Sequence, residues 1–107
     1  MDAVERQVEA YNAGDVDAFV ACYANDVVFE DADGAAQTGG RDEMRKRYGE
    51  LFASAPNLHA EITSRIRVGS YVVDEERVSG LPNGEIHAVA IYKLDDEGLI
   101  ERVRFLP

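Results

Sequence analysis

The sequence feature that most restricts the fold is a regular alternation of apolar and polar residues between Leu58 and Val68. Ala60, Ile62 and Ile66 lie an even number of positions apart, and polar or charged residues fill the odd positions between them. Consecutive side chains of a strand point to opposite faces of its sheet. The alternation therefore predicts an antiparallel strand that buries one face and exposes the other.

Three further strands are predicted after this one, each separated from the last by a turn-forming sequence. Gly69-Ser70 leads into the segment 71–79, and the Asn-Gly pair at 83–84 is typical of a β-hairpin. The segments 85–94 and 99–106 follow on either side of an acidic turn. The second half of the chain is thus predicted to form a four-stranded antiparallel meander.

The first half of the chain carries helical periodicity instead, with apolar residues recurring every three or four positions. This pattern predicts helices at residues 3–13, 16–23 and 41–55. A β-branched and aromatic run at 27–31 predicts a strand, and the glycine-containing stretch 33–40 predicts a loop. Because the helices precede the meander rather than alternate with its strands, the fold class is predicted to be α+β.

Composition restricts the function as well as the fold. The 107 residues suit a single domain, 1–107, and 11 Lys and Arg against 21 Asp and Glu give a formal charge of −10. This charge repels phosphate backbones and anionic lipids, so we expect no nucleic-acid partner and no membrane association. No apolar run is long enough to span a membrane, and the lone Cys22 is compatible with a reducing compartment. We therefore expect a cytoplasmic protein.

Two segments of the chain also resemble a known family. The run YNAGDVDAFVACYANDVVFEDADG, residues 11–34, and the closing IYKLDDEGLIERVRFLP are similar to ketosteroid isomerases and their relatives in the nuclear transport factor 2-like and SnoaL-like superfamily. The resemblance covers essentially the whole chain. It implies a cone-shaped, cystatin-like α+β barrel, in which three helices of the N-terminal half pack on a strongly curved, mixed or antiparallel sheet around an internal pocket. It implies no one activity, because members include isomerases, cyclases, dehydratases and non-catalytic transport or dimerisation modules.

Asp31 is the first candidate catalytic residue. By resemblance, the run Phe29-Glu30-Asp31 matches the position of the isomerases' catalytic aspartate, which removes a proton from the carbon next to a carbonyl group. Partial burial at the lip of a pocket would raise the pKa of this carboxyl toward that task. The alternative is that the Asp31 side chain only caps the turn that follows its strand.

The isomerases pair this base with two hydrogen-bond donors, and both positions differ in this chain. Their tyrosine on the first helix falls on Gln7, and their acid on the third meander strand falls on Ala90. An amide is a less acidic donor than a phenol, and alanine donates nothing. Since the loss of one such donor typically costs about 10²–10³ in rate, we do not expect a steroid isomerase that works by the family's mechanism.

Asp74 and Glu76 are the other candidate catalytic residues. They lie two positions apart in the segment 71–79, so they share one face with Val72 and Val78. The resemblance places that face toward the pocket, where neighbouring carboxyls raise each other's pKa or bind a cation. A shift of register by one residue would instead leave an exposed acidic face, paired with the arginines at 65 and 67.

Aromatic side chains are predicted to line the pocket, although their spacing equally suits ordinary core residues. The candidate ligand-binding residues are Gln7, Tyr11, Phe29, Tyr48, Phe52, Tyr92 and Phe105. No metal site is expected, since the sequence has no HxH, HExxH or CxxC motif and its two histidines are predicted to point in separate directions. No phosphate-binding loop is present either, and we expect no cofactor.

Together these residues predict a pocket for a small, mostly apolar molecule that is neutral or cationic, because an acidic pocket disfavours carboxylates and phosphates. The protein would be a cofactor-independent isomerase, lyase or hydrolase, with Asp31 as general base and Asp74 or Glu76 as helper. Gln7 or a tyrosine would donate a hydrogen bond. The alternative is a non-catalytic ligand-binding or dimerisation module, whose hollow is filled by core side chains.

The sheet face opposite the pocket is also predicted to have a partner. It carries Val73, Val89 and Ile91 between polar residues. A chain of this size that exposed such apolar surface would tend to associate. We therefore expect a symmetric homodimer that forms through the outer face of the sheet.

Overall fold

The computed structural model describes residues 1–36 and 39–107, which form three helices and five strands. The helices are α1 (Ala3–Ala13), α2 (Val16–Val20) and α3 (Gly40–Ser54), and the strands are β1 (Tyr23–Glu30), β2 (His59–Val68), β3 (Tyr71–Ser79), β4 (Ile86–Leu94) and β5 (Ile100–Leu106). The predicted α+β class, with its helices in the N-terminal half, is confirmed. Residues 37 and 38, inside the loop predicted at 33–40, lie outside the described residues.

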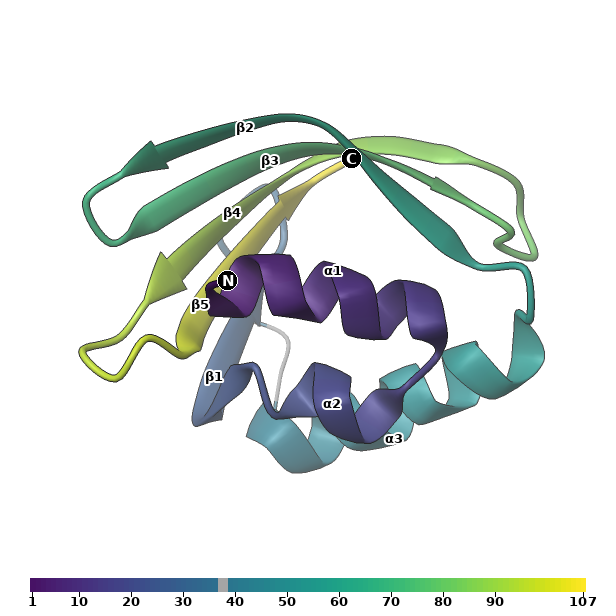
Figure 1. The fold of residues 1–107 in the computed structure, drawn as a ribbon, viewed down its shortest axis with the longest axis horizontal. Coiled ribbons are helices and arrows are strands. Elements are labelled where there is room, and N and C mark those ends of the chain that lie inside the picture. The colour runs from purple at the N-terminus through teal and green to yellow at the C-terminus, as the bar shows by residue number, and fades with distance from the viewer. Residues whose placement is uncertain (37–38) are drawn as a thin grey trace.

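The strands form one mixed sheet in the order β1-β5-β4-β3-β2. Strands β2 to β5 pair antiparallel in sequence order, which confirms the predicted meander. Strand β1 joins the sheet at its edge by pairing parallel to β5. Figure 1 shows the long strands bending over α1, with α2 and α3 on the same side of the sheet. One face of the sheet is therefore covered by helices.

The boundary between α2 and β1 differs from the prediction. Helix α2 ends at Val20, and the strand begins at Tyr23 rather than at Val27. The reason is pairing with β5: Tyr23 lies opposite Ile100, and the Ile100 N–H donates to the carbonyl of Cys22 at 3.0 Å. This pairing holds the turn-forming sequence after Tyr23 in an extended conformation. The register with β5 shifts between Tyr23 and Val28, so the strand is irregular there.

The alternating segment is a strand, but it does not keep one face buried along its whole length. A register shift between Ile62 and Ser64 inserts an extra residue relative to β3. Beyond this bulge the faces exchange. Ile66 and Val68 are 59% and 69% exposed, whereas Arg65 turns toward the helix side of the sheet. The expectation that Ile66 and Val68 share the buried face of Ala60 is therefore wrong.

Helix α1 is fixed across the sheet by contacts with both ends of β2. Near its C-terminal end, the Asn12 side chain donates to the Ala60 carbonyl at 3.0 Å and accepts from the Ala60 N–H at 2.7 Å. At its N-terminal end, Arg67 pairs with Asp2 and Glu5, which also form the capping box of the helix. These contacts hold α1 so that its inner side faces the sheet.

Two groups of buried apolar residues form the core. The larger one joins α1, α2, β1 and β5 through side chains such as Val4, Phe19, Tyr23 and Ile100, and the smaller one includes Leu58, Ala60 and Val78. Among the described residues, no helix combines the length and apolar character that crossing a membrane requires.

Candidate functional site

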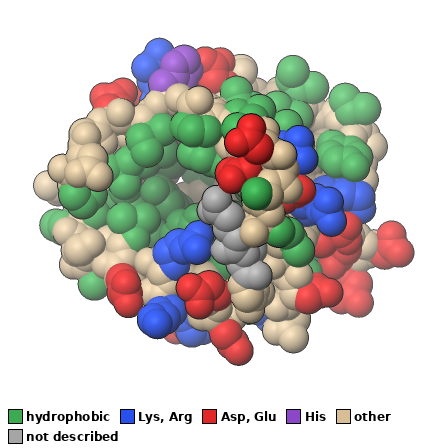
Figure 2. Space-filling model, turned by 180° about the vertical axis from the view of Figure 1, so that it is seen from behind, with side chains coloured by type: hydrophobic (Ala, Val, Ile, Leu, Met, Phe, Trp, Pro, Cys, Tyr) green, Lys and Arg blue, Asp and Glu red, His purple; other side chains and the backbone are tan. Residues whose placement is uncertain are grey.

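A cavity of about 470 Å³ lies between the helices and the sheet, and all three helices and all five strands contribute to its lining. Figure 2 shows a hollow on one face of the molecule with mainly hydrophobic walls. Pockets that bind small molecules are usually about 300–1,000 Å³ and mostly apolar. The cavity therefore has the size and character of a small-molecule site.

Six of the seven predicted ligand-binding residues line this cavity, namely Gln7, Tyr11, Phe29, Tyr48, Tyr92 and Phe105. Phe52 packs edge-on against Tyr11 instead, with ring centroids 5.4 Å apart. Several further lining residues were not predicted from the sequence, among them one aromatic and one charged residue. Phe19 reaches the cavity from α2, and Arg47 reaches it from α3 beside Tyr48. The apolar stripe of α2 could have identified Phe19, whereas Arg47 lies within a basic stretch that suggests only an exposed helix face.

Gln7 links two buried tyrosines by hydrogen bonds. The Tyr23 hydroxyl donates to Oε1 of Gln7, and Nε2 of Gln7 donates to the Tyr92 hydroxyl, both at 3.2 Å. Burial raises the pKa of both phenols well above its usual value, so both remain neutral at physiological pH. In this arrangement Tyr92 acts as an acceptor toward Gln7 and keeps its own O–H proton for an acceptor in the cavity.

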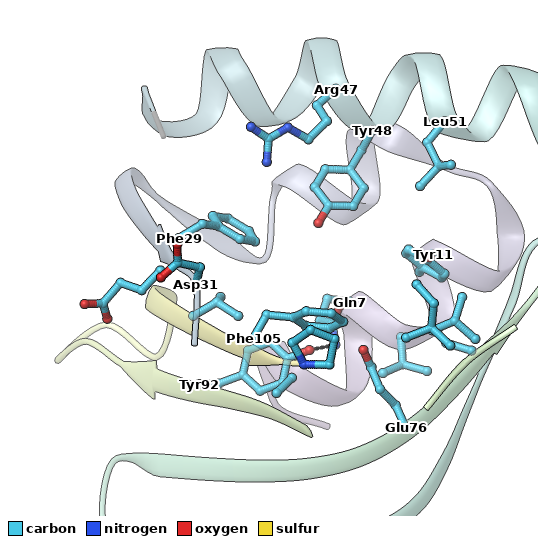
Figure 3. A pocket seen from close by; sticks show the side chains of 18 of the residues that line it. Gln7, Tyr11, Phe29, Asp31, Arg47, Tyr48, Leu51, Glu76, Tyr92 and Phe105 are labelled. Carbon is cyan, nitrogen blue, oxygen red and sulfur yellow. Dashed lines mark hydrogen bonds between the residues drawn. The ribbon is translucent and has the colours of Figure 1, made fainter. Parts of the chain in front are cut away.

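Glu76 places a carboxyl group inside the cavity. The residue is 9% exposed and lines the cavity from β3, with its carboxyl near Gln7 (Figure 3). Burial raises the pKa of Glu76 to about 7, and the negative charge of Asp74 adds to this effect. No residue in the described part of the chain forms a hydrogen bond or ion pair with it. Glu76 can therefore exchange a proton near neutral pH.

Asp74 lies on the same buried face of β3 but is held by an arginine. The Arg65 side chain donates from Nε to Oδ1 at 2.6 Å and from Nη2 to Oδ2 at 2.8 Å. The Asp74 side chain is fully buried, and Arg65 approaches it from β2 beyond the bulge. The structure thus combines two sequence alternatives, because the acidic face is buried and one of its acids is paired with Arg65.

Asp31 lies at the edge of the cavity and is half-buried. Its Oδ1 accepts hydrogen bonds from the backbone N–H groups of Asp33 and Ala35, at 2.9 and 3.0 Å. This is the turn-capping arrangement that the sequence left open as an alternative. The carboxyl of Asp31 therefore lies at the lip of the site with one oxygen already used by the loop.

Two further acids, Glu30 and Asp33, border the cavity near Asp31, whereas neither His59 nor His87 lines it. His87 contacts Glu75 on the outer face of the sheet, with Nε2 and Oε2 2.6 Å apart. Within residues 1–36 and 39–107, no three His, Cys, Asp or Glu side chains are arranged to hold a metal ion. The polar groups that the described site offers include Glu76, Asp31, Arg47, the tyrosines and Gln7.

Comparison with protein-family models gives one match. The model described as the SnoaL-like domain aligns with residues 4–103. The chain belongs to the SnoaL-like family. The match confirms the resemblance seen in the sequence, and no curated protein sequence matches the chain significantly.

Solved structures with the fold of this SnoaL-like chain are numerous. An uncharacterized cystatin fold protein from Novosphingobium aromaticivorans is 28% identical, with a TM-score of 0.87, and the alignment covers 98% of this chain and 95% of that one. A ketosteroid isomerase-like fold protein from Catenulispora acidiphila, solved in complex with trimethylamine, is 21% identical, with a TM-score of 0.77 and 98% and 84% coverage. The Δ5-3-ketosteroid isomerase from a Mycobacterium species is 20% identical, with a TM-score of 0.82 and 98% and 89% coverage.

The register of this SnoaL-like sheet shows which residues surround Ala90. Ala90 lies opposite Asp74, and the neighbouring pairs on the same face are Val72 with Tyr92 and Glu76 with Ala88. Tyr92 and Glu76 therefore flank Ala90 on the cavity face. The sequence identified both residues as candidates, but their positions on either side of Ala90 depend on the pairing of β3 with β4.

Proposed function

We propose that this SnoaL-like protein binds a small, mostly apolar molecule in its cavity and moves a proton on it through Glu76, without a cofactor. The observation that carries the proposal is a buried carboxyl with a pKa of about 7 in an aromatic cavity. General acid–base catalysis is most effective when the pKa of the catalytic group lies near the working pH. The reaction class is that of an isomerase or lyase.

The site residues divide the steps of such a reaction between them. The Glu76 carboxylate removes a proton from the carbon next to a carbonyl group, and the electron pair passes to the carbonyl oxygen. The Tyr92 hydroxyl donates a hydrogen bond to this oxygen, while Gln7 and Tyr23 hold Tyr92 in place. The Glu76 carboxylic acid then returns the proton to the same carbon or to a conjugated one.

Asp31 and Asp74 have secondary roles in this proposal. Asp31 lines the mouth of the cavity, so its carboxyl borders the part of the ligand nearest the opening. Asp74 acts through its charge, which keeps the pKa of Glu76 raised. Asp74 is therefore a positioning residue, because it acts on Glu76 rather than on the ligand.

A ligand-binding module without catalysis is the second candidate. Two observations favour it. The isomerases' hydrogen-bond donors correspond by resemblance to Gln7 and Ala90, and Asp31 accepts hydrogen bonds from its own loop. In that case the cavity would hold its ligand without changing it.

Deuterium exchange separates the two candidates. Small β,γ-unsaturated ketones are incubated with the protein in D₂O, and loss of the proton signal next to the carbonyl is followed by NMR. We expect catalysed exchange with the wild type and a loss of about 10²-fold or more with Glu76→Gln, because the amide cannot accept the proton. Asp31→Asn tests the base role at the mouth, and Glu75→Gln, on the opposite face of the same strand, is the matched control. Ketone binding without exchange would support the non-catalytic module.

We also propose that the protein is a homodimer that forms through the outer face of the sheet. Because of the bulge in β2, this face carries Ile66 and Val68 in addition to Val73, Val89 and Ile91, and Ile66 lies opposite Val73. Tyr71, opposite Val68, is 46% exposed. A continuous apolar surface of this kind fits a second copy of itself.

A further inference from the structure

The inner end of the cavity combines one buried carboxyl with four tyrosines. The charge of Glu76 contributes to raising the pKa of Tyr11, Tyr23, Tyr48 and Tyr92, so all four hydroxyls lie within its electrostatic reach. These residues come from α1, β1, α3 and β4, and each lines the cavity. The carboxyl is thus surrounded by aromatic rings from several sides.

Glu76 has no counter-ion among the described residues. The nearby arginine, Arg65, has both of its carboxylate contacts with Asp74. Arg47 lies on α3, across the cavity from Glu76 (Figure 3). A carboxylate that is nine-tenths buried is costly unless a positive charge pairs with it, and without one it keeps its proton.

We infer that the cavity binds a methylated ammonium group, with Glu76 as the counter-ion and the faces of the surrounding tyrosines as the rest of its enclosure. The inference rests on the proposed function, because it names the ligand class of the same cavity. Cations bind favourably over the faces of aromatic rings, and this attraction is stronger in sites shielded from water. The net charge of −10 further favours the entry of a cation over that of an anion.

The hydrogen-bonding pattern favours a methylated ammonium over a primary one. A primary ammonium carries three N–H donors, and each requires an acceptor when it is buried. Oε1 of Gln7 and the Tyr92 hydroxyl oxygen each already accept one hydrogen bond, from Tyr23 and Gln7 respectively, so each has one acceptor site left for an ammonium N–H. A trimethylated or dimethylated head needs few or no acceptors, and its methyl groups pack against the apolar walls.

Binding of such a cation is coupled to the ionisation of Glu76. Of the groups around it, the four tyrosines remain neutral between pH 6 and 8 because burial raises each pKa, and Asp74 is held by Arg65. Arg47 lines the cavity from α3, and Asp31 lies at the mouth. Glu76 is therefore the facing group that changes charge in this range. Since only its ionised form pairs with the ligand, affinity for the cation rises with pH.

Choline and its neutral isostere 3,3-dimethylbutan-1-ol test the inference, because they have nearly the same shape and differ in charge. Both are titrated calorimetrically into the wild-type protein at pH 6 and pH 8. We expect choline to bind about tenfold more tightly at pH 8, as follows from a pKa of about 7. The affinity for the alcohol should stay the same or fall as the pH rises. Equal affinity for the two probes at pH 8 would overturn the inference and leave the proposed function standing.

Variants of β3 complete the test. Glu76→Gln should no longer bind choline more tightly than the alcohol, but its affinity for the alcohol should be kept. Glu76→Asp should still bind choline more tightly, with the same pH dependence. Glu75→Gln removes one negative charge from the opposite face of the same strand and should behave as the wild type. Choline affinity that survives in a folded Glu76→Gln variant would overturn the inference, as would a failure of choline to bind the wild type. The deuterium-exchange experiment decides the proposed function separately in either case.

Discussion

The guanidinium of Arg65 holds both carboxylate oxygens of Asp74 from the adjacent strand, at 2.6 and 2.8 Å. Glu76, two residues further along β3 on the same face, has no such partner among the described residues. The difference decides their chemistry. A paired carboxylate holds a fixed charge, whereas an unpaired buried carboxyl releases and takes up a proton near neutral pH.

Breaking this ion pair should strongly destabilise the fold. Arg65→Met leaves the buried Asp74 charge without a partner, which we expect to lower the free energy of unfolding by about 3 kcal/mol. Urea denaturation followed by circular dichroism measures the change. The double variant Arg65→Met/Asp74→Asn should recover much of the loss, because it removes the uncompensated charge. A loss below about 1 kcal/mol in the single variant would show that Asp74 finds another partner.

The buried carboxyl of Glu76 should make stability depend on pH. Its pKa is about 7 in the folded state and near 4.5 in the unfolded state, so the folded protein holds more protons between these values. Stability therefore falls as the pH rises through this window, by up to about 3 kcal/mol. Glu76→Gln should flatten the profile and be the more stable protein at pH 8. Parallel profiles for the two proteins, from denaturation at pH 5 and pH 8, would contradict the expected titration.

Much of the architecture could be predicted from the sequence, because it depends on local patterns. The helices of the first half, the meander and the hairpin turns follow from periodicity and from residues such as Gly84. The bulge in β2 could not be predicted. Thr63 and Ser64 are both small and polar, so either can lie on the inner or the outer face. The sequence pattern therefore does not show that one residue at this point is extra. It becomes visible only through pairing with β3.

The site, too, could be predicted only where it depends on spacing along one strand or helix. Parity identified Asp74 and Glu76 as neighbours on one face, but it could not show which of them Arg65 would bind. That choice depends on the bulge, which turns Arg65 toward Asp74. Phe52 has the helical spacing of a lining residue, yet it packs behind Tyr11. Spacing within one helix does not show which of two packed aromatic rings lies at the cavity wall.

The hydrogen bonds of Gln7 should support both stability and function. Gln7→Leu leaves the hydroxyls of Tyr23 and Tyr92 without their shared partner, which we expect to cost about 1–3 kcal/mol of unfolding free energy. The same variant should slow deuterium exchange on the ketone substrates, since Tyr92 loses the contact that positions it. Chemical denaturation and NMR measure the two effects. Unchanged exchange in a folded variant would remove Tyr92 and Gln7 from the proposed mechanism.

The homodimer is tested most directly on the exposed half of β2. Ile66→Asp introduces a charge into the outer face at a position that is 59% exposed, so the fold of the subunit should tolerate it. Size-exclusion chromatography with light scattering should show a dimer for the wild type and an 11.8 kDa monomer for the variant. A wild-type protein that is already monomeric at micromolar concentration would refute the proposed interface.

The extra residue between Ile62 and Ser64 makes β2 a strand of two opposed polarities. Its first half supplies small apolar side chains to the covered interior. In its second half, two arginines point to the helix side, where they bind Asp74 and the start of α1, and two aliphatic side chains point to the outer face. Removal of one residue here would reverse the second half and with it the charge balance of the interior. Relatives without this insertion should therefore show the inverse order of arginine and aliphatic positions in the second half of this strand.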